Sequence, residues 1–232
     1  MGHIRDLSLP AMERQRGPYR YYFGRLLPQD REARIVEVGC GFGPFLHFLR
    51  GEGYQNVEGF DVSPQQVEAA GRLGIAGVTR GELSSYLASR GGLYDCVVAI
   101  DVVDHIPKDE VLDALRLVHE SLKPGGRFLM QAVNGAAPFP GRLRYGDFTH
   151  EFAFTPNSVR QVLRAAGFKE IEVRGAPPYV HGIPSLLRRL IGCFAGVVMW
   201  AYMVAETGML RGHIFSQNLI VAAEKRGAGA GG

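Results

Sequence analysis

The stretch RIVEVGCGFGPFLHFL, from Arg34 to Leu49, carries three glycines at alternate positions between two apolar segments. The residues before the glycines are typical of a buried strand containing one acid, Glu37, and those after them are typical of a helix. Glycine lets the backbone turn sharply and lets a ligand lie directly against it. A strand, a glycine-rich turn and a helix in this order therefore predict a nucleotide-binding site.

Three classes of nucleotide site differ in the residues that follow the first glycine. A phosphate-binding loop ends in Gly-Lys-Ser/Thr, which does not occur in this stretch. A dinucleotide site requires G-x-G-x-x-G, and counting from Gly39 places Pro44 where the third glycine belongs. The pattern that remains is E-x-G-x-G-x-G, formed by Glu37, Gly39, Gly41 and Gly43.

The composition is that of an ordinary globular protein. Of the 232 residues, 46% are hydrophobic and 21% charged, which indicates a single soluble domain. We expect this domain to cover residues 1–226, with a helical insert at about 175–215 and a disordered tail at 227–232. The formal net charge of +3 is too small to indicate nucleic acid as a partner.

The three cysteines, Cys40, Cys96 and Cys193, are scattered and lack the C-x-x-C spacing of a zinc or redox site. Their odd number and irregular spacing also argue against a disulfide framework. The N-terminus is polar and has no apolar core of signal-peptide length. These features predict a protein of the reducing cytoplasm, with no metal expected.

Apolar runs of strand length alternate with helical patterns along the chain. The predicted strands are 34–38, 56–60, 76–80, 94–100, 127–133, 169–173 and 216–224. The predicted helices begin at Phe45 and at Pro64 after a Ser63 N-cap, and span 108–122 and 155–168, with a turn at 123–126. This alternation predicts crossover connections and a parallel sheet covered on both faces.

Four segments in this order resemble the class I S-adenosylmethionine-dependent methyltransferases. They are the E-x-G-x-G-x-G motif, the acid Asp61 in GFDVS, YDCVVAIDVVDHI at 94–106, and LKPGGRFLM at 122–130. The resemblance covers roughly residues 30–175 and the final strand. It implies an α/β fold with a Rossmann-like, doubly wound seven-stranded sheet, mostly parallel with an antiparallel last strand.

The resemblance implies S-adenosylmethionine as the cofactor. This molecule has no phosphate and carries a sulfonium and an amino group, so nearby carboxylates favour it. Asp61 offers two acceptor oxygens to the ribose hydroxyls, with a helix-capping turn acid as the alternative, and Glu37 is expected beneath the methionine portion. The cofactor-binding residues implied are Glu37, Gly39, Cys40, Gly41, Gly43, Asp61, Val62, Ile100, Asp101 and, at the adenine edge, Gly81, Glu82 and Leu83.

A substrate site is expected beyond the carboxyl ends of the strands, in the loops 101–107 and 134–155. Removal of a proton from a hydroxyl benefits from a general base, and histidine suits neutral pH. The candidate catalytic residues are His150, His105, Asp147 and Glu151, with His150 preferred as the base.

Two alternatives to this catalytic assignment stay open from the sequence. His105 is equally well explained as a loop histidine hydrogen-bonded to the backbone. Asp147, His150 and Glu151 lie within five residues of one another and offer the ligands of a metal site instead.

The insert contains sixteen uncharged residues, Leu190 to Ala205. A helix of that length is ~24 Å long, short of a bilayer span, and it is apolar nearly all round. We expect it to be covered by the sheet edge or by a second copy of the chain through residues 183–206. The alternative is a membrane-facing lid with Arg188 and Arg189 at the lipid headgroups.

The expected function is methyl transfer from S-adenosylmethionine to a small-molecule or glycan acceptor, at oxygen. The segment DFTHEFAFTP is similar to one in methyltransferases that act on sugars and on polysaccharide or lipid-linked glycans, which favours a glycan acceptor. Alternatives are a quinone or lipid O-methyltransferase, a small-molecule N-methyltransferase, and a cofactor-binding protein without turnover.

Overall fold

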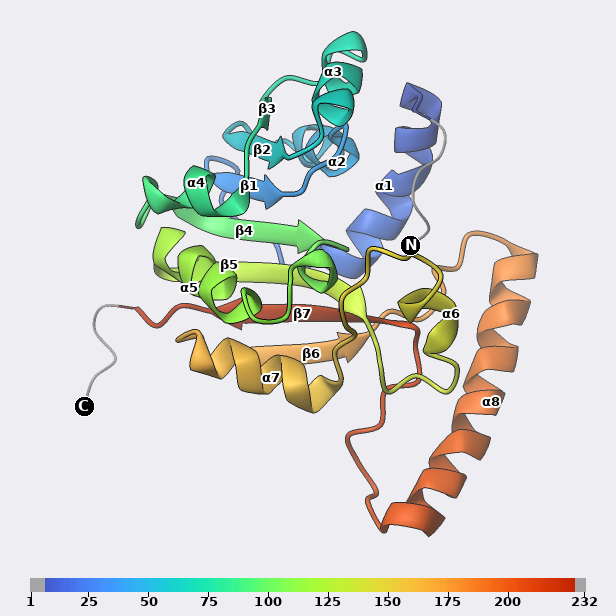
Figure 1. Cartoon of the computed structure of the whole chain (residues 1–232). Helices are drawn as coiled ribbons and strands as arrows, with labels where there is room; N and C mark the ends of the chain where they lie inside the picture. The colour runs from blue at the N-terminus through green and yellow to red at the C-terminus, as the bar shows by residue number, and fades with distance from the viewer. Residues whose placement is uncertain (1–6, 228–232) are drawn as a thin grey trace.

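The computed structural model describes residues 7–227 and contains a seven-stranded sheet in the order β3-β2-β1-β4-β5-β7-β6 (Figure 1). Its strands are β1 (Ile35–Val38), β2 (Val57–Asp61), β3 (Val78–Arg80), β4 (Tyr94–Ile100), β5 (Leu122–Val133), β6 (Ile171–Gly175) and β7 (Asn218–Glu224). The strands β3, β2, β1, β4 and β5 pair in parallel, and β7 pairs antiparallel with β5 and with β6. The predicted fold class, including the antiparallel last strand, is confirmed.

The helices separate the strands and lie on both sides of the sheet. They are α1 (Leu9–Phe23), α2 (Pro44–Gly51), α3 (Pro64–Arg72), α4 (Leu83–Ala88), α5 (Val111–Ser121), α6 (Gly141–Arg144), α7 (Pro156–Ala165) and α8 (Ile183–Thr207), with a 3-10 turn at Val103–His105. Ser63 caps α3 through its side chain, as predicted. The short helices α4 and α6 were not predicted, because neither is long enough to show a helical period.

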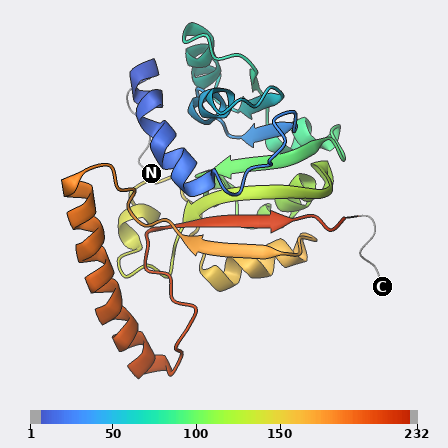
Figure 2. The same cartoon turned by 180° about the vertical axis from the view of Figure 1, so that it is seen from behind.

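Two apolar cores form on opposite faces of the sheet. One face packs against α4, α5 and α7, which lie in front of the sheet in Figure 1. The other face packs against α1 and α2, seen in front in Figure 2. Successive residues of β4 alternate between the cores, since Val97 belongs to the first and Cys96 and Val98 to the second.

The predicted turn at 123–126 lies inside β5, which begins at Leu122, and forms an irregular segment there: Tyr94 pairs with Leu122 and Cys96 with Arg127. The backbone N–H of Gly125 donates to the carbonyl of Lys225, and the N–H of Lys225 donates to the carbonyl of Gly126. These bonds extend the pairing with the last strand beyond the apolar part of β5. Polar residues with a glycine pair can therefore continue a strand when a neighbouring strand accepts their hydrogen bonds.

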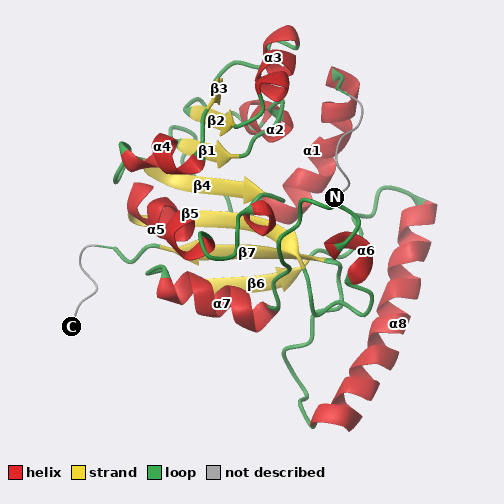
Figure 3. Cartoon of the chain, in the orientation of Figure 1, coloured by secondary structure: helices red, strands yellow, loops and turns green. Residues whose placement is uncertain are grey.

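The insert forms a helix close to the expected residues 183–206 but differs from its prediction in burial. Helix α8 has 25 residues and ends at Gly208, which has a left-handed conformation. It stands clear of the sheet, as Figure 3 shows, and Ser185 is its only buried residue. The expected cover by the sheet edge is therefore wrong. The predicted tail lies outside the described residues apart from Gly227.

Candidate active site

The glycine-rich turn between β1 and α2 packs closely against the loop after β4. Gly39, Gly41 and Gly43 all have positive φ angles, of 62°, 54° and 84°. A Cβ on Gly39 would lie 2.5 Å from the side chain of Val102, so glycine at this position allows the loop after β4 to approach β1. Gly43 is the N-cap of α2 and is followed by Pro44 in the first turn.

Asp61, at the end of β2, ties this turn in place. One carboxylate oxygen accepts the N–H of Gly41 at 2.8 Å, and the other accepts the N–H of Ser63 at 2.9 Å. Asp61 is thus a turn acid, which was the alternative to ribose binding. A carboxylate has about four acceptor positions, so both oxygens retain capacity for a ligand's hydroxyls, and the ribose contact stays a prediction.

A cavity of about 490 Å³ opens at the carboxyl ends of β1 and β2. Six of the predicted cofactor residues line it, namely Gly39, Asp61, Val62, Gly81, Glu82 and Leu83. Its remaining wall comes from the loop after β4 and from α5, including Ile106, Asp109, Glu110, Asp113 and Leu117. The wall residues on and before α5 had no predicted role, because 108–122 showed only the apolar spacing of a helix.

Glu37 and Asp101 lie at the ends of the neighbouring strands β1 and β4, outside the lining of the cavity. Glu37 is buried, and its Oε2 has no hydrogen-bond partner among residues 7–227. Burial, and then the negative charge of Asp61, raise the pKa of Glu37 well above its usual value. Asp101 has a positive φ of 54° and accepts the side-chain N–H₂ of Gln131 on both oxygens at 2.9 Å.

The other predicted cofactor residues lie outside the lining of the cavity. Cys40 is buried beside Gly59, and Ile100 packs against the second core. Neither lines the cavity, and the same holds for Gly41 and Gly43, which shape the turn. They stay predictions as direct cofactor contacts.

His105 and His150, predicted from separate loops, lie with their ring centroids 4.5 Å apart. Nδ1 of His150 is 2.9 Å from the carbonyl of Leu143, and its Nε2 is 3.6 Å from Oδ2 of Asp104. Asp104 is completely buried, and its second oxygen has no hydrogen-bond partner in the described chain. Both ring nitrogens of His150 therefore face protein groups.

His105 is held by a chain of two hydrogen bonds. The Thr149 hydroxyl donates to Asp147 at 2.6 Å, and Nδ1 of His105 lies 2.9 Å from the same hydroxyl oxygen. Because the hydroxyl has a single proton and gives it to Asp147, Nδ1 of His105 must be the donor of the second bond. This fixes the tautomer and leaves Nε2 of His105 as the acceptor, on a residue that lines the cavity.

Asp147 is the ionised end of this chain. Hydrogen bonds from the side chain and backbone of Thr149 lower the pKa of Asp147 to about 2. Thr149 had no predicted role, and the signal that could have found it is its position between Asp147 and His150. Glu151 is exposed and contributes its backbone, whose N–H donates to the carbonyl of Asp104 at 2.9 Å.

The metal set proposed as an alternative from the sequence also changes. Asp104, His105 and His150 are the residues that offer ligand atoms within 4.8 Å of one another in the described part of the chain. Asp147 and Glu151 do not belong to this group. The grouping crosses two loops, so the spacing along the sequence could not reveal it.

A second cavity, of about 510 Å³, lies where the connections of α8 meet the sheet. Its lining includes Tyr22, Arg142, Pro178, Phe215 and, from β5, Gln131. Two of its residues reach the first site, since Gln131 holds Asp101 and the carbonyl of Leu143 faces His150. Neither Asp101 nor His150 lines the first cavity, so the two linings have no residue in common and these hydrogen bonds link the loops beside them.

A fold with a glycine turn after β1, an acid ending β2 and an antiparallel last strand defines a class I methyltransferase. The model of the family described as "Methyltransferase domain" matches residues 12–173, and the chain belongs to this family. Its cofactor is S-adenosylmethionine, as implied by the sequence motifs. The observed site fits this molecule, because an unpaired buried carboxylate and an acid-lined cavity suit a cationic ligand without phosphate.

Comparisons with known proteins agree on the fold and on the reaction class. The chain is 30% identical over 158 residues to the O-methyltransferase cnsE of Penicillium expansum, covering 64% of this chain and 56% of that protein. It is 28% identical over 163 residues to the ubiquinone biosynthesis O-methyltransferase of Burkholderia thailandensis, covering 61% and 67%. The chain thus matches little more than half to two thirds of these relatives.

Solved structures show the same fold at lower sequence identity. A SAM-dependent methyltransferase from Archaeoglobus fulgidus superposes with a TM-score of 0.67 at 18% identity, over 94% of this chain and 100% of that one. A phosphoethanolamine N-methyltransferase 2 from Haemonchus contortus, in complex with S-adenosyl-L-methionine, gives 0.61 at 17% identity, over 97% and 60%.

Proposed function

We propose that this protein transfers the methyl group of S-adenosylmethionine to a hydroxyl oxygen of a small molecule. The observation that carries the proposal is the hydrogen-bonded chain from Asp147 through Thr149 to His105 at the wall of the cofactor cavity. A hydroxyl must lose its proton as its oxygen forms the new bond, and a fixed imidazole nitrogen accepts it. Both curated relatives described above are named O-methyltransferases, which also supports oxygen over nitrogen.

Each residue of the site has a separate task in this proposal. The bound cofactor supplies a methyl carbon already activated by its sulfonium. Asp61 binds the ribose hydroxyls of the cofactor, and Glu37 compensates the cofactor's positive charge. Nε2 of His105 takes the acceptor's proton. Asp147 stabilises the resulting imidazolium through Thr149, as a carboxylate does behind a catalytic histidine.

His105 replaces the sequence's first choice, His150, as the proposed base. His150 has both nitrogens directed at protein acceptors, and its side chain is 8% exposed. Its task is then to position His105, against whose ring it packs, and to neutralise buried Asp104. The choice between the two histidines rests on which nitrogen is free to accept a proton.

The second cavity is the proposed acceptor site. Tyr22 and Phe215 offer aromatic surface, and Arg142 offers a cation on the same lining. This chemistry suits an aromatic or quinone-type hydroxyl compound with an acidic group, and so favours the quinone part of the quinone or lipid alternative. The glycan acceptor predicted from DFTHEFAFTP stays a prediction, since that segment supplies Thr149 and His150 to the base but no residue of this lining.

The test is methyl transfer by the purified protein to a matched set of acceptors. A dihydroxybenzoate, its methyl ester, a monosaccharide and an aromatic amine are each incubated with S-adenosylmethionine, and products are identified by mass spectrometry. We expect O-methylation of the dihydroxybenzoate with the lowest KM. Arg142→Gln should raise this KM about tenfold and leave that of the ester unchanged. Methylation of the monosaccharide alone would restore the glycan acceptor, and methylation only of amines would refute the proposal.

A further inference from the structure

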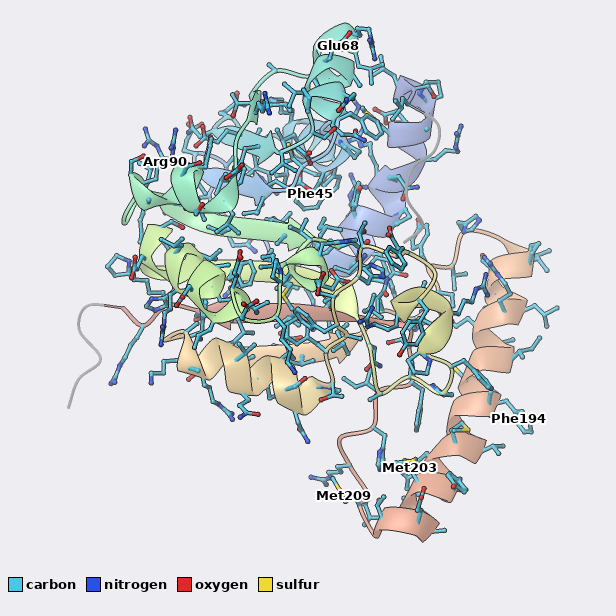
Figure 4. All side chains as sticks on the ribbon, in the orientation of Figure 1. Phe45, Glu68, Arg90, Phe194, Met203 and Met209 are labelled. Carbon is cyan, nitrogen blue, oxygen red and sulfur yellow. The ribbon has the colours of Figure 1, made fainter. Side chains whose placement is uncertain are left out.

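The surface of α8 carries more exposed large apolar side chains than any other described helix. Those on α8 itself are Ile183, Leu186, Leu187, Leu190, Ile191, Phe194, Val197, Val198, Trp200 and Tyr202. Among residues 7–227, α8 is the helix long and apolar enough to cross a membrane by length and composition, and none of its most apolar window is buried. In Figure 4, Phe194 points away from the rest of the molecule.

The apolar side chains share one broad face. Ile183, Leu187, Leu190, Phe194 and Val197 recur at helical spacing, and further apolar residues flank them on both sides. The opposite side carries Ser185, Gly192 and Gly196 together with the half-buried Met199 and Met203, and the return segment lies against this side and its border. A Cβ on Gly196 would lie 3.9 Å from Phe215 of the return segment, and the indole N–H of Trp200 donates to the carbonyl of Leu210 at 3.0 Å.

The topology excludes a helix that crosses the bilayer. The strands on either side of α8 pair with each other, with Gly175 opposite Leu219, so both ends of the helix return to one sheet. A helix of 25 residues is about 37 Å long. If it spanned the membrane, the return segment 208–217 would have to recross hydrocarbon in extended form with unpaired backbone groups, which lipid does not tolerate.

Charge and aromatic residues favour a lipid surface over a second copy of the chain. Arg188 near one end of the helix and Arg211 beyond the other are exposed, and Glu206 is the only acid on the helix. A partner helix would cover a narrow apolar stripe, whereas the apolar face here is wider than one stripe. Basic residues at the margins and aromatic residues at the border are typical of helices that lie in the membrane interface.

A second set of exposed aromatic side chains lies on the loop around α6. Phe139, Tyr145 and Phe148 are largely exposed. This loop shares the second cavity with both connections of α8, through Arg142, Pro178 and Phe215. The second cavity therefore joins this loop to the connections at both ends of α8.

We propose that α8 docks the protein on bilayers that contain anionic lipid, lying in the interface plane with its apolar face in the acyl region. The arginines at its two ends then contact the headgroups. Docking is a binding event of its own and does not depend on the methyl-transfer chemistry.

The experiment measures vesicle binding without any methyl acceptor. The full chain is floated with phosphatidylcholine vesicles that contain or lack phosphatidylglycerol. We expect it to float with the anionic vesicles, and Leu190→Glu with Phe194→Glu to reduce binding more than tenfold. Leu9→Glu, an exposed apolar position on α1 at the end distant from α8 in Figure 1, is the matched control and should bind as the wild type does. The double variant Arg188→Gln, Arg211→Gln should bind the anionic vesicles roughly tenfold more weakly than the wild type does.

Trp200 gives a second readout, because it is the only tryptophan of the chain. Its emission should shift to the blue on vesicle binding and be quenched more by lipids brominated near the headgroup than by lipids brominated near the chain end. Absence of flotation and of any emission change would overturn the proposal. A dimer that ignores vesicles and dissociates in the Leu190→Glu, Phe194→Glu variant would assign the face to a second copy instead. Neither result affects methyl transfer to a soluble acceptor, so the two proposals fail separately.

Discussion

Helix α7 precedes strand β6 and helix α8 follows it, and the apolar side chains of α7 are buried whereas those of α8 are exposed. In α7, Val159 and Leu163 are fully buried against the sheet, and Thr155 caps the helix through a reciprocal pair of bonds with Ser158. In α8, Leu190 and Phe194 are 58% and 74% exposed. The more apolar helix is the less buried one, so apolar content shows that a helix needs a cover but does not identify it.

The same contrast separates the cofactor end of the sheet from α8. Asp61 and His105 are hydrogen-bonded to neighbours within the chain, whereas the exposed face of α8 has no cover in the described residues. Substitutions at the cofactor end should therefore change the folding stability or the turnover of the domain. Matched substitutions on α8 should leave folding and soluble-substrate turnover unchanged, which is the comparison that the following experiments test.

The largest effect is expected for His105→Ala. Loss of the base should reduce kcat by ~10²–10⁴-fold on a soluble acceptor, while cofactor affinity stays nearly normal. Thr149→Val should retain part of the rate, because it removes the orienting hydroxyl and not the imidazole. Leu190→Ala is the α8 control. His150→Ala with a greater loss than His105→Ala would return the base to His150, and activity dependent on a divalent ion would make Asp104, His105 and His150 a metal site.

A second pair of variants compares the helices directly. Leu163→Ala should lower the free energy of unfolding by about 2–5 kcal/mol, since it leaves a cavity under α7. Leu190→Ala should change it by less than about 0.5 kcal/mol, because its side chain is already in contact with solvent. Urea unfolding measures both. Equal losses would mean that α8 is covered in solution.

Asp61→Ala should weaken S-adenosylmethionine binding by ~2 kcal/mol, as the charge-assisted bonds to the ribose are lost. Part of this effect comes from the turn, because Asp61 also holds the N–H of Gly41. Calorimetry measures the affinity, and Glu206→Ala, an exposed acid of α8, is the control. Unchanged affinity, or tighter binding of NAD, contradicts the assigned role.

The smallest effect concerns Glu37 and pH. Its pKa is raised in the folded protein, so above the unfolded value of 4.5 the unfolded chain loses its proton first and folding stability falls as pH rises. Glu37→Gln removes this dependence. In the absence of cofactor the variant should gain about 1 kcal/mol or more relative to wild type between pH 4.5 and 8, as measured by urea unfolding. Glu206→Gln, at an exposed position, should show no such gain in stability. An equal gain in both variants would mean that burial of Glu37 is not its cause.

Much of the fold was predictable because its signals are local. The glycine turn, the Ser63 cap and the buried strand β4 each depend on neighbouring residues, and the predicted strands lie within a few residues of the observed ones, except at the start of β5. That start depends on pairing with Lys225, about a hundred residues away in the chain. No local pattern contains that information.

The site was predictable only in part, for the same reason. Residues next to a strand end, such as Asp61 and Glu82, were named from the family resemblance, and both line the first cavity. The bond between Thr149 and His105 joins two loops, and the second cavity draws on α1, β5, α6 and both connections of α8. The sequence named both histidines but could not show which ring nitrogen is free.

The acid lining of the cofactor cavity also bears on the end of the catalytic cycle. Asp61, Glu82, Asp109, Glu110 and Asp113 surround it, and its described lining contains no lysine or arginine. Transfer of the methyl group removes the sulfonium charge, so the spent cofactor has one positive charge fewer than the fresh one. A field of this sign attracts the fresh cofactor and releases the spent one more readily. Product inhibition should therefore be weak at low ionic strength and grow as salt screens the carboxylates.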